Sequence, residues 1–332
     1  MEKRRSPFKK RPFGNVKGTT RQLDLLDLLQ TYELLPADHL MAAYDKPEGA
    51  QRLITLLNHN GFIGIVEAST RHMRVYNRPK VYELTPKGIQ LLKDKARWRG
   101  RVWERDHFLH KFLRTLVQFS FDIAPKEVPG LKLRTLEDIL AHPNCPEATR
   151  HEERPSYFMA AGHQIRPDGE LFGYELNRRY FYLHGHEDDR GTETRGGSSI
   201  YGKKTITAMI RGYAEYLDLG IYRTKYGIRN ISIPIICTTY PDLLAIFEVI
   251  KREVPEKFWP CFLGKVIPDF TSMEPFPKPT GHMFTEDWLR PDGSRFNIHA
   301  FMATGKPTWT STEPVPSLEK SSSAESNLPL SS

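Results

Sequence analysis

Three acidic residues and one lysine in the second half of the sequence have the chemistry to act on a phosphodiester with the help of a divalent cation. Asp168 lies in a turn-forming Arg-Pro-Asp-Gly sequence, and Glu187 and Asp189 end a stretch with the pattern of a strand. Carboxylate oxygens bind Mg²⁺ or Mn²⁺, and the bound metal ion activates water. Lys204 lies in the next expected helix, where its ammonium group would stabilise developing negative charge. We therefore predict Asp168, Glu187 and Asp189 as metal ligands and, together with Lys204, as catalytic residues.

Each part of this pattern also has a plain structural explanation. Pro-Asp-Gly forms turns in its own right, and Arg-Pro-Asp-Gly recurs at 290–293, where no pair of acids follows. Acidic clusters at strand ends are usually solvated. The order of the parts is what favours a site: an aspartate turn, a strand that ends in Glu187-x-Asp189, and a helix that carries Lys204.

Nearby histidines are weaker candidates for a ligand site. His107 and His110 are one helical turn apart, as in a transition-metal pair, but on an apolar helix such residues more often pack. His184 and His186 lie on the strand that ends in the acids, so they are better placed to touch a ligand. Most strand histidines are nevertheless structural.

The elements that must position these residues follow from the hydrophobic pattern. Helices are expected from Phe108 onward, near 135–142, at 201–219 and at 242–253, and strands at 157–164, 171–176, 179–186, 230–238 and 262–267. A helix, three strands and then alternating helices and strands predict an α/β domain with a central mixed sheet.

The N-terminal part has the pattern of a winged helix-turn-helix domain. Helices are expected from Thr19 up to a break at 32–36, at 37–44, at 48–59 and up to about Lys95, with strands at 62–67 and 81–84 around a basic segment, 69–80. The third helix would lie in a DNA major groove, with Lys46, Gln51 and Arg52 near its exposed face. The hairpin cations expected to contact DNA phosphates are Arg71, Arg74, Arg78 and Lys80. A winged helix used for protein contacts is the alternative.

Charge supports a polyanionic partner. The 332-residue chain has a formal net charge of +8, and residues 1–18 form a basic arm without a hydrophobic core. Its cations that we expect to bind DNA are Arg4, Arg5, Lys9, Lys10 and Arg11. A solubilising tail is the alternative explanation for this arm.

The sequence also excludes several classes of protein. No apolar stretch is long enough to span a membrane, and the N-terminus has no signal-peptide core, so we expect a cytoplasmic protein. Cys145, Cys237 and Cys261 are scattered, which argues against a disulfide framework and against a cysteine zinc site. Nucleotide-binding loops and a nucleophile elbow are also absent from the sequence.

Taken together, the motifs resemble the replication-relaxation family of plasmid and mobile-element proteins, in which a winged helix precedes a domain similar to PD-(D/E)xK nucleases. The matching residues are Leu84-Thr-Pro-Lys-Gly, His110, Pro167-Asp168, Glu187-x-Asp189-Arg-Gly-Thr-Glu, and the helix with Lys204 and Tyr213. The resemblance covers roughly residues 19–240. It implies an α+β protein of two domains, 19–98 and 99–270. From composition we expect a Pro- and Ser-rich extension, 271–332, with a disordered tail.

The resemblance also implies a function. It predicts a protein of a mobile genetic element that binds double-stranded DNA in replication, relaxation or mobilisation, with metal-dependent nicking or cleavage at Asp168, Glu187 and Asp189. The nuclease pattern has a lysine where this chain has Asp189, which leaves open a non-catalytic DNA-binding accessory, or a transcriptional regulator with an inactive nuclease-like domain. A homodimer and contacts with other replication or mobilisation proteins are further expectations.

Overall fold

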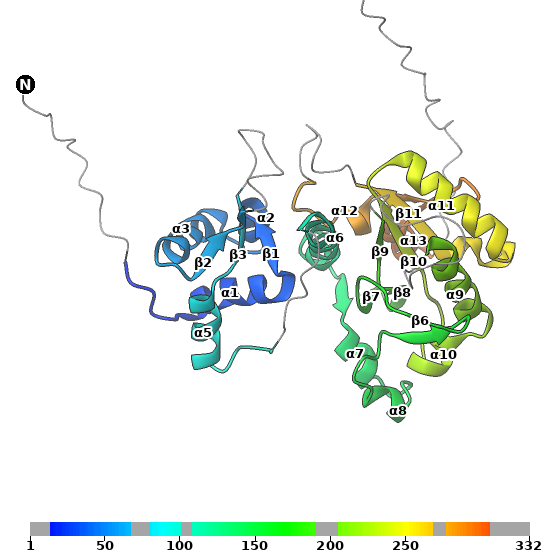
Figure 1. Ribbon diagram of the computed structural model, residues 1–332, viewed down its shortest axis with the longest axis horizontal. Helices are drawn as coiled ribbons and strands as arrows, with labels where there is room; N and C mark the ends of the chain where they lie inside the picture. The colour runs from blue at the N-terminus through cyan, green and yellow to red at the C-terminus, as the bar shows by residue number, and fades with distance from the viewer. Residues whose placement is uncertain (1–13, 68–79, 101–107, 190–204, 268–276, 306–332) are drawn as a thin grey trace, which may run out of the picture.

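The computed structural model describes residues 14–67, 80–100, 108–189, 205–267 and 277–305 and shows an α+β protein with mixed sheets (Figure 1). Several predicted functional residues lie outside this description. They are Arg4, Arg5, Lys9, Lys10, Arg11, Arg71, Arg74, Arg78, His107, Lys204 and the side chain of Asp189. The tail from 306 onward lies outside it as well.

The N-terminal unit consists of helices around a three-stranded antiparallel sheet of order β1-β3-β2. Its elements are α1 (Thr20–Tyr32), β1 (Leu34–Pro36), α2 (Ala37–Ala42), α3 (Pro47–His59), β2 (Ile63–Ile65), β3 (Val81–Leu84) and α5 (Pro86–Asp94). Leu26, Leu29, Ile54 and Leu57 are fully buried between the helices. The helices and both expected strands are confirmed. The sequence does not predict β1, because three residues that end in proline look like a helix break.

Local chemistry fixes where these helices begin. The side chain of Gln22 accepts a hydrogen bond from the backbone N–H of Thr19 at 3.0 Å, before the first turn of α1. Thr85 Oγ1 accepts from the N–H of Gly88 at 3.2 Å, and Pro86 occupies the first turn of α5.

Helix α6 (Phe108–Glu127) lies between the N-terminal unit and the second unit, which contains the remaining sheets. Figure 1 shows this helix nearly end-on. Phe112 and Val117 pack into the core beneath the sheet, whereas Phe119 and Ile123 pack into the core of the N-terminal unit. Tyr32 donates a hydrogen bond to Asp122 Oδ2 at 2.6 Å. Helix α6 therefore contributes buried side chains to the cores of both units.

The second unit is built on two sheets that meet at one strand. One sheet has the order β4-β7-β8 and the other has the order β13-β12-β11-β10-β9. Their strands are β4 (Lys132–Arg134), β7 (Leu171–Leu176), β8 (Arg179–His184), β9 (Glu187–Asp189), β10 (Ile233–Cys237), β11 (Phe262–Val266), β12 (Asp287–Leu289) and β13 (Arg295–Asn297). A parallel bridge between Leu183 and Ser232 joins β8 to the start of β10, which already pairs in parallel with β9. The two sheets thus form one continuous mixed surface.

Helices and a hairpin cover this surface. They are α7 (Leu136–Ala141), α8 (Glu147–Arg150), the hairpin β5 (Phe158–Ala160) and β6 (His163–Ile165), α9 (Ile206–Asp218), α10 (Ile221–Tyr226), α11 (Tyr240–Glu253), the 3-10 helix η1 (Glu256–Cys261), α12 (His282–Thr285) and α13 (Ile298–Thr304). The single strand expected at 157–164 is wrong in one respect. Ala161 and Gly162 both have positive φ, 49° and 74°, so the chain turns there and forms two short strands instead.

A bulge at Gly185 divides the strand that carries the site into β8 and β9. Leu183 and His186 face the α6 side of the sheet, whereas His184 and Glu187 face α9, so the alternation of side chains gains one residue at Gly185. The φ of Gly185 is +36°, and a Cβ at this position would lie 2.2 Å from the carbonyl oxygen of Gly169. Glycine is therefore required at this point.

The segment from 281 to 304 belongs to the second unit and is not an extension outside it, so the boundary predicted at residue 270 is corrected. Met283, Trp288 and Met302 are buried in the same cluster as α6. The hairpin β12–β13 adds two strands to the sheet through β11. Pro and Gly content suggests a loose extension, but the apolar residues between them complete the core.

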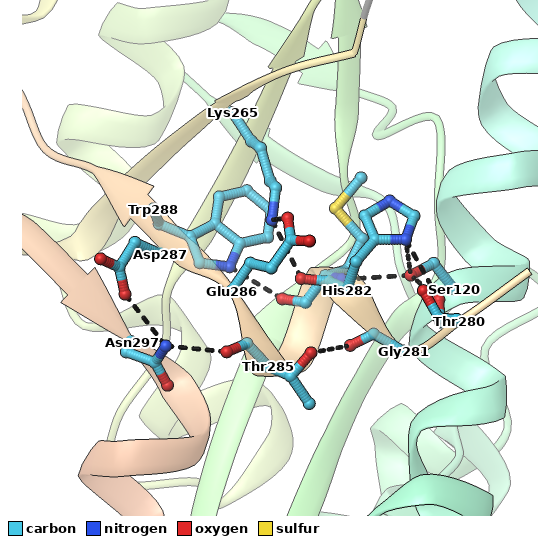
Figure 2. Close-up of polar contacts among 11 residues, drawn as sticks. Ser120, Lys265, Thr280, Gly281, His282, Thr285, Glu286, Asp287, Trp288 and Asn297 are labelled. Atoms are coloured by element: carbon cyan, nitrogen blue, oxygen red, sulfur yellow. Dashed lines mark hydrogen bonds and ion pairs between the residues drawn. The ribbon is translucent and has the colours of Figure 1, made fainter. Parts of the chain in front are cut away.

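Polar contacts fix this segment in place (Figure 2). Ser120 of α6 donates a hydrogen bond to the carbonyl of Thr280 at 2.7 Å. Lys265 of β11 donates to the carbonyl of His282 at 2.9 Å and pairs with Glu286 at 2.9 Å. Burial lowers the pKa of Lys265, although Glu286 opposes the shift. These contacts tie the C-terminal segment to both α6 and the sheet.

Candidate functional site

Asp168 is anchored on the bulged strand by backbone hydrogen bonds. The N–H groups of Asp168 and Gly169 both donate to the carbonyl of His186, at 3.1 and 3.2 Å. In return, the N–H of Asp188 donates to Asp168 Oδ2 at 2.9 Å. The turn before β7 is thereby held against β9, as the order of the motifs predicts.

Two histidine–aspartate pairs meet at this point, and we call His110, Asp168, His186 and Asp188 the polar pocket. His110 Nε2 of α6 lies 3.4 Å from Asp168 Oδ1. His186 Nδ1 lies 2.9 Å from Asp188 Oδ2, and both side chains are completely buried. The polar pocket therefore joins α6, the turn before β7 and the bulged strand.

Electrostatics in the polar pocket favours protonated histidines. Pairing with Asp168 raises the pKa of His110, although partial burial opposes it. Burial is the largest influence on His186 and lowers its pKa, but the carboxylates of Asp188 and Asp168 together outweigh burial and raise the pKa. Of the two histidines, His110 lies 3.4 Å from Asp168 Oδ1, and the side chain of Asp168 is partly exposed.

Glu187 faces the opposite side of the sheet from the polar pocket. The hydroxyl of Tyr213 in α9 donates to Glu187 Oε1 at 2.6 Å, and both side chains are buried. Burial and then Glu187 raise the pKa of Tyr213 well above its ordinary value, and Asp168 adds to the shift. The carboxyl group of Glu187 is thus engaged by α9, away from the polar pocket.

The predicted metal site is only partly described. Asp168 and Glu187 are both held at β9 but face opposite sides of the sheet, whereas the side chains of Asp189 and Lys204 lie outside the described residues. Within the described part of the chain, no group of three or more His, Cys, Asp or Glu residues is arranged to hold a metal ion. One oxygen of Asp168 and one of Glu187 already accept hydrogen bonds. The described donors alone therefore do not make a complete cation site.

Two members of the polar pocket cannot be recognised as partners from the sequence. Asp188 looks like one member of an acidic cluster, and His110, although it belongs to the family resemblance, looks like a packing residue of an apolar helix. The signal for Asp188 is its position two residues after His186 on a strand, since such residues share a face. No local signal connects His110 with Asp168, because only the packing of α6 against the sheet brings them together.

In the N-terminal unit, α3 exposes a polar face. Glu48, Gln51, Arg52 and His59 are exposed, while Ala50, Ile54 and Leu57 on the opposite face are buried. Lys46 is exposed at the N-cap of this helix, and Lys80 is exposed before β3. The structure therefore places the predicted residues of α3 at the surface, where they can reach a ligand.

Comparison of the chain with protein-family models, with curated proteins and with solved structures gave no match. No helix within the described ranges combines the length and the apolar character needed to cross a bilayer. The function of this chain therefore has to be inferred from its own residues.

Proposed function

We propose that this chain binds double-stranded DNA, with residues 20–94 as a winged helix-turn-helix domain and α3 as its recognition helix. The main support for this proposal is the order of the elements along the chain, α1-β1-α2-α3-β2-β3-α5, in which β3 lies between β1 and β2 in the sheet. The polar outer face of α3 agrees with it. An α-helix of this kind fits the major groove, and Lys46 at its N-cap lies where a phosphate would approach the helix.

A salt series on duplex binding tests this proposal. Fluorescence anisotropy with a random-sequence duplex should show a linear fall of log affinity with log salt concentration. Changing Lys46 and Arg52 together to Ala should weaken binding and flatten the slope by about 0.9 for each phosphate that is no longer neutralised. Changing Lys251 and Arg252 of α11 together to Ala is the matched control, since it removes two exposed cations from the other unit. Equal slopes for all proteins would refute α3 as the DNA-binding helix.

The basic arm belongs to the same proposal. Residues 1–13, the first part of the basic arm 1–18, carry a concentration of cations that would bind phosphates without sequence specificity. Deleting these residues should flatten the salt slope further and leave the preference among duplex sequences unchanged. On the resemblance to replication-relaxation proteins, we propose replication, relaxation or mobilisation of a mobile genetic element as the process that this binding serves.

A second candidate function, metal-dependent DNA nicking or cleavage, is favoured by one observation. Asp168 is hydrogen-bonded to the backbone of the strand that carries Glu187, as it would be in a nuclease-like site. On this candidate Asp168, Glu187 and Asp189 would hold Mg²⁺ or Mn²⁺, which would require the side chain of Glu187 to leave Tyr213 and turn toward the face of Asp168. The metal ion, when bound, would supply an activated water. Supercoiled plasmid incubated with each metal should yield nicked or linear DNA, and Asp168→Asn should abolish it. If the unchanged protein leaves the plasmid supercoiled with both metals, the domain is a non-catalytic DNA-binding accessory.

A further inference from the structure

The outer face of the β5–β6 hairpin carries side chains that neither the fold nor the proposed site uses. Phe158 pairs with Ile165 across the hairpin, and both face inward and are buried. Met159 and Gln164, which pair at the next position, are exposed, and 62% of Met159 is accessible to solvent. An exposed thioether on a short hairpin has no role in the core.

At the open end of the hairpin, two guanidinium groups lie against one aromatic ring. The Cζ atoms of Arg154 and Arg166 are 5.6 and 5.7 Å from the ring centroid of Tyr157. Arg166 Nε donates to Gln164 Oε1 at 2.8 Å, which orients the guanidinium. The carbonyl of Tyr157 accepts a hydrogen bond from Lys225, so the backbone here is also held. We call Arg154, Tyr157, Met159, Gln164 and Arg166 the hairpin platform.

The charge of the hairpin platform suits a phosphate backbone. None of its five side chains is acidic, and both arginines are exposed. The nearby Glu152 is paired with Lys225 at 2.7 Å. Aromatic rings, guanidinium planes and thioethers provide flat or polarizable surfaces for unpaired bases, and the arginines provide the counter-charge for phosphates.

The platform leads directly to the candidate site. Arg166 is followed by Pro167 and then by Asp168, and two residues of extended chain span at most about 7 Å. Asp168 therefore lies close to the Arg166 end of the platform. A duplex hides the faces of its bases, so the platform cannot stack on base-paired DNA without unpairing it.

We propose that the hairpin platform binds single-stranded DNA by base stacking and phosphate contacts and guides the strand to Asp168. This inference rests on the proposed function for the identity of the polymer as DNA, but the binding itself requires no cleavage.

Anisotropy of the full chain with a labelled oligothymidylate and with a labelled duplex, without metal, tests the platform. Tyr157→Ala should weaken single-strand binding about tenfold, and Tyr157→Phe should retain it, because the ring holds the guanidinium groups of Arg154 and Arg166 in place. Arg166→Ala should weaken it too and flatten the salt slope by about 0.7, the value for one neutralised phosphate of a single strand. None of these changes should alter duplex binding through α3.

Tyr180→Ala is the matched control, since Tyr180 is another exposed tyrosine, 44% accessible, on β8. It should leave single-strand binding unchanged. Retained duplex binding by Tyr157→Ala shows that the variant is folded. The proposal that the platform binds single-stranded DNA is overturned if the unchanged protein does not bind the oligothymidylate, or if it binds no more tightly than Tyr157→Ala. If the unchanged protein binds the single strand but not the duplex, only the proposed function is refuted.

Discussion

His184 and His186 lie two residues apart in the sequence and are both completely buried, yet their surroundings are opposite in character. Around His184 are the rings of Phe158, Tyr213 and Tyr216, with centroids 5.1, 5.8 and 4.8 Å away. We call these four residues the aromatic pocket. Neither ring nitrogen of His184 has a hydrogen-bond partner within the described structure, and burial lowers the pKa of His184 to about 3.

On the other side of the strand, His186 shares the polar pocket with Asp188. The carboxylate raises the pKa of His186 despite complete burial, so the same residue type is neutral on one face of the strand and favours the protonated form on the other. A buried charge is tolerated only beside a partner of opposite charge. The bulge at Gly185 therefore decides which histidine obtains a partner.

The largest expected effect comes from removing the bulge, with Gly185→Ala. The new Cβ would lie 2.2 Å from the carbonyl oxygen of Gly169 and 2.8 Å from Pro167, at a φ of +36°. Strain and overpacking together should lower the free energy of unfolding by about 3 kcal/mol or more. Urea denaturation measures this loss, and we expect both pockets to be disturbed.

Gly293→Ala provides the control for backbone strain alone. Its φ is +83°, but a Cβ there meets no atom within 4 Å. It should lower the free energy of unfolding by about 1–2 kcal/mol. If both variants lower the free energy of unfolding by the same amount, the close packing of the Pro167–Gly169 turn on Gly185 does not add to the cost of the substitution.

The bulge also marks a limit of what the sequence reveals. Helices α1, α3, α9 and α11 could be predicted to within a few residues because their apolar spacing and capping residues are local signals. Alternation along a strand predicts one face for His184 and His186, and only the contact of Gly185 with the turn at Gly169 reverses it.

The same distinction applies to the site and to the C-terminal segment. The proximity of Asp168 to β9 could be predicted, since the order of strands brings a turn and a strand end to one edge. The pairing of His110 with Asp168 could not, because it depends on how α6 packs. Trp288 gives no periodic signal in a segment rich in Pro and Gly, and its burial arises from α6 and the sheet.

A smaller effect should appear in the pH dependence of stability, through the aromatic pocket. His184 is neutral in the folded protein down to a pKa of about 3, whereas in the unfolded chain its pKa is near 6.5. As pH falls below 6.5, the unfolded state binds a proton that the folded state rejects, so stability is lost on acidification. This contribution approaches about 1.4 kcal/mol per pH unit.

His184→Leu isolates this contribution, because the other titrating groups cancel in the difference between the two proteins. Denaturation at a series of pH values from 8 to about 5 gives the free energy of unfolding of both proteins. Above the pKa of His184 in the unfolded chain, the two free energies should differ by a constant amount. Below it, the unchanged protein should lose stability faster than the variant. A difference that stays constant throughout would mean that His184 is not held neutral.

The last comparison concerns two hydroxyl groups on α9. Tyr213 donates to the buried Glu187, so Tyr213→Phe removes a donor from a carboxylate and should lower the free energy of unfolding by about 1–3 kcal/mol. The hydroxyl of Tyr216 is buried in the aromatic pocket without a hydrogen-bond partner in the described structure. Tyr216→Phe should therefore leave stability unchanged or raise it by up to about 1 kcal/mol.

The two variants remove the same atom from the same helix, so their difference reports only what surrounds each hydroxyl. If Tyr216→Phe is as harmful as Tyr213→Phe, the Tyr216 hydroxyl has a polar partner and the pocket around His184 is not purely aromatic. Neutral His184 would then have a hydrogen-bonding neighbour, and the acid loss of stability expected from it should shrink in the same protein. A harmless Tyr216→Phe beside a harmful Tyr213→Phe would instead place the polar chemistry of this strand at Glu187 and the polar pocket.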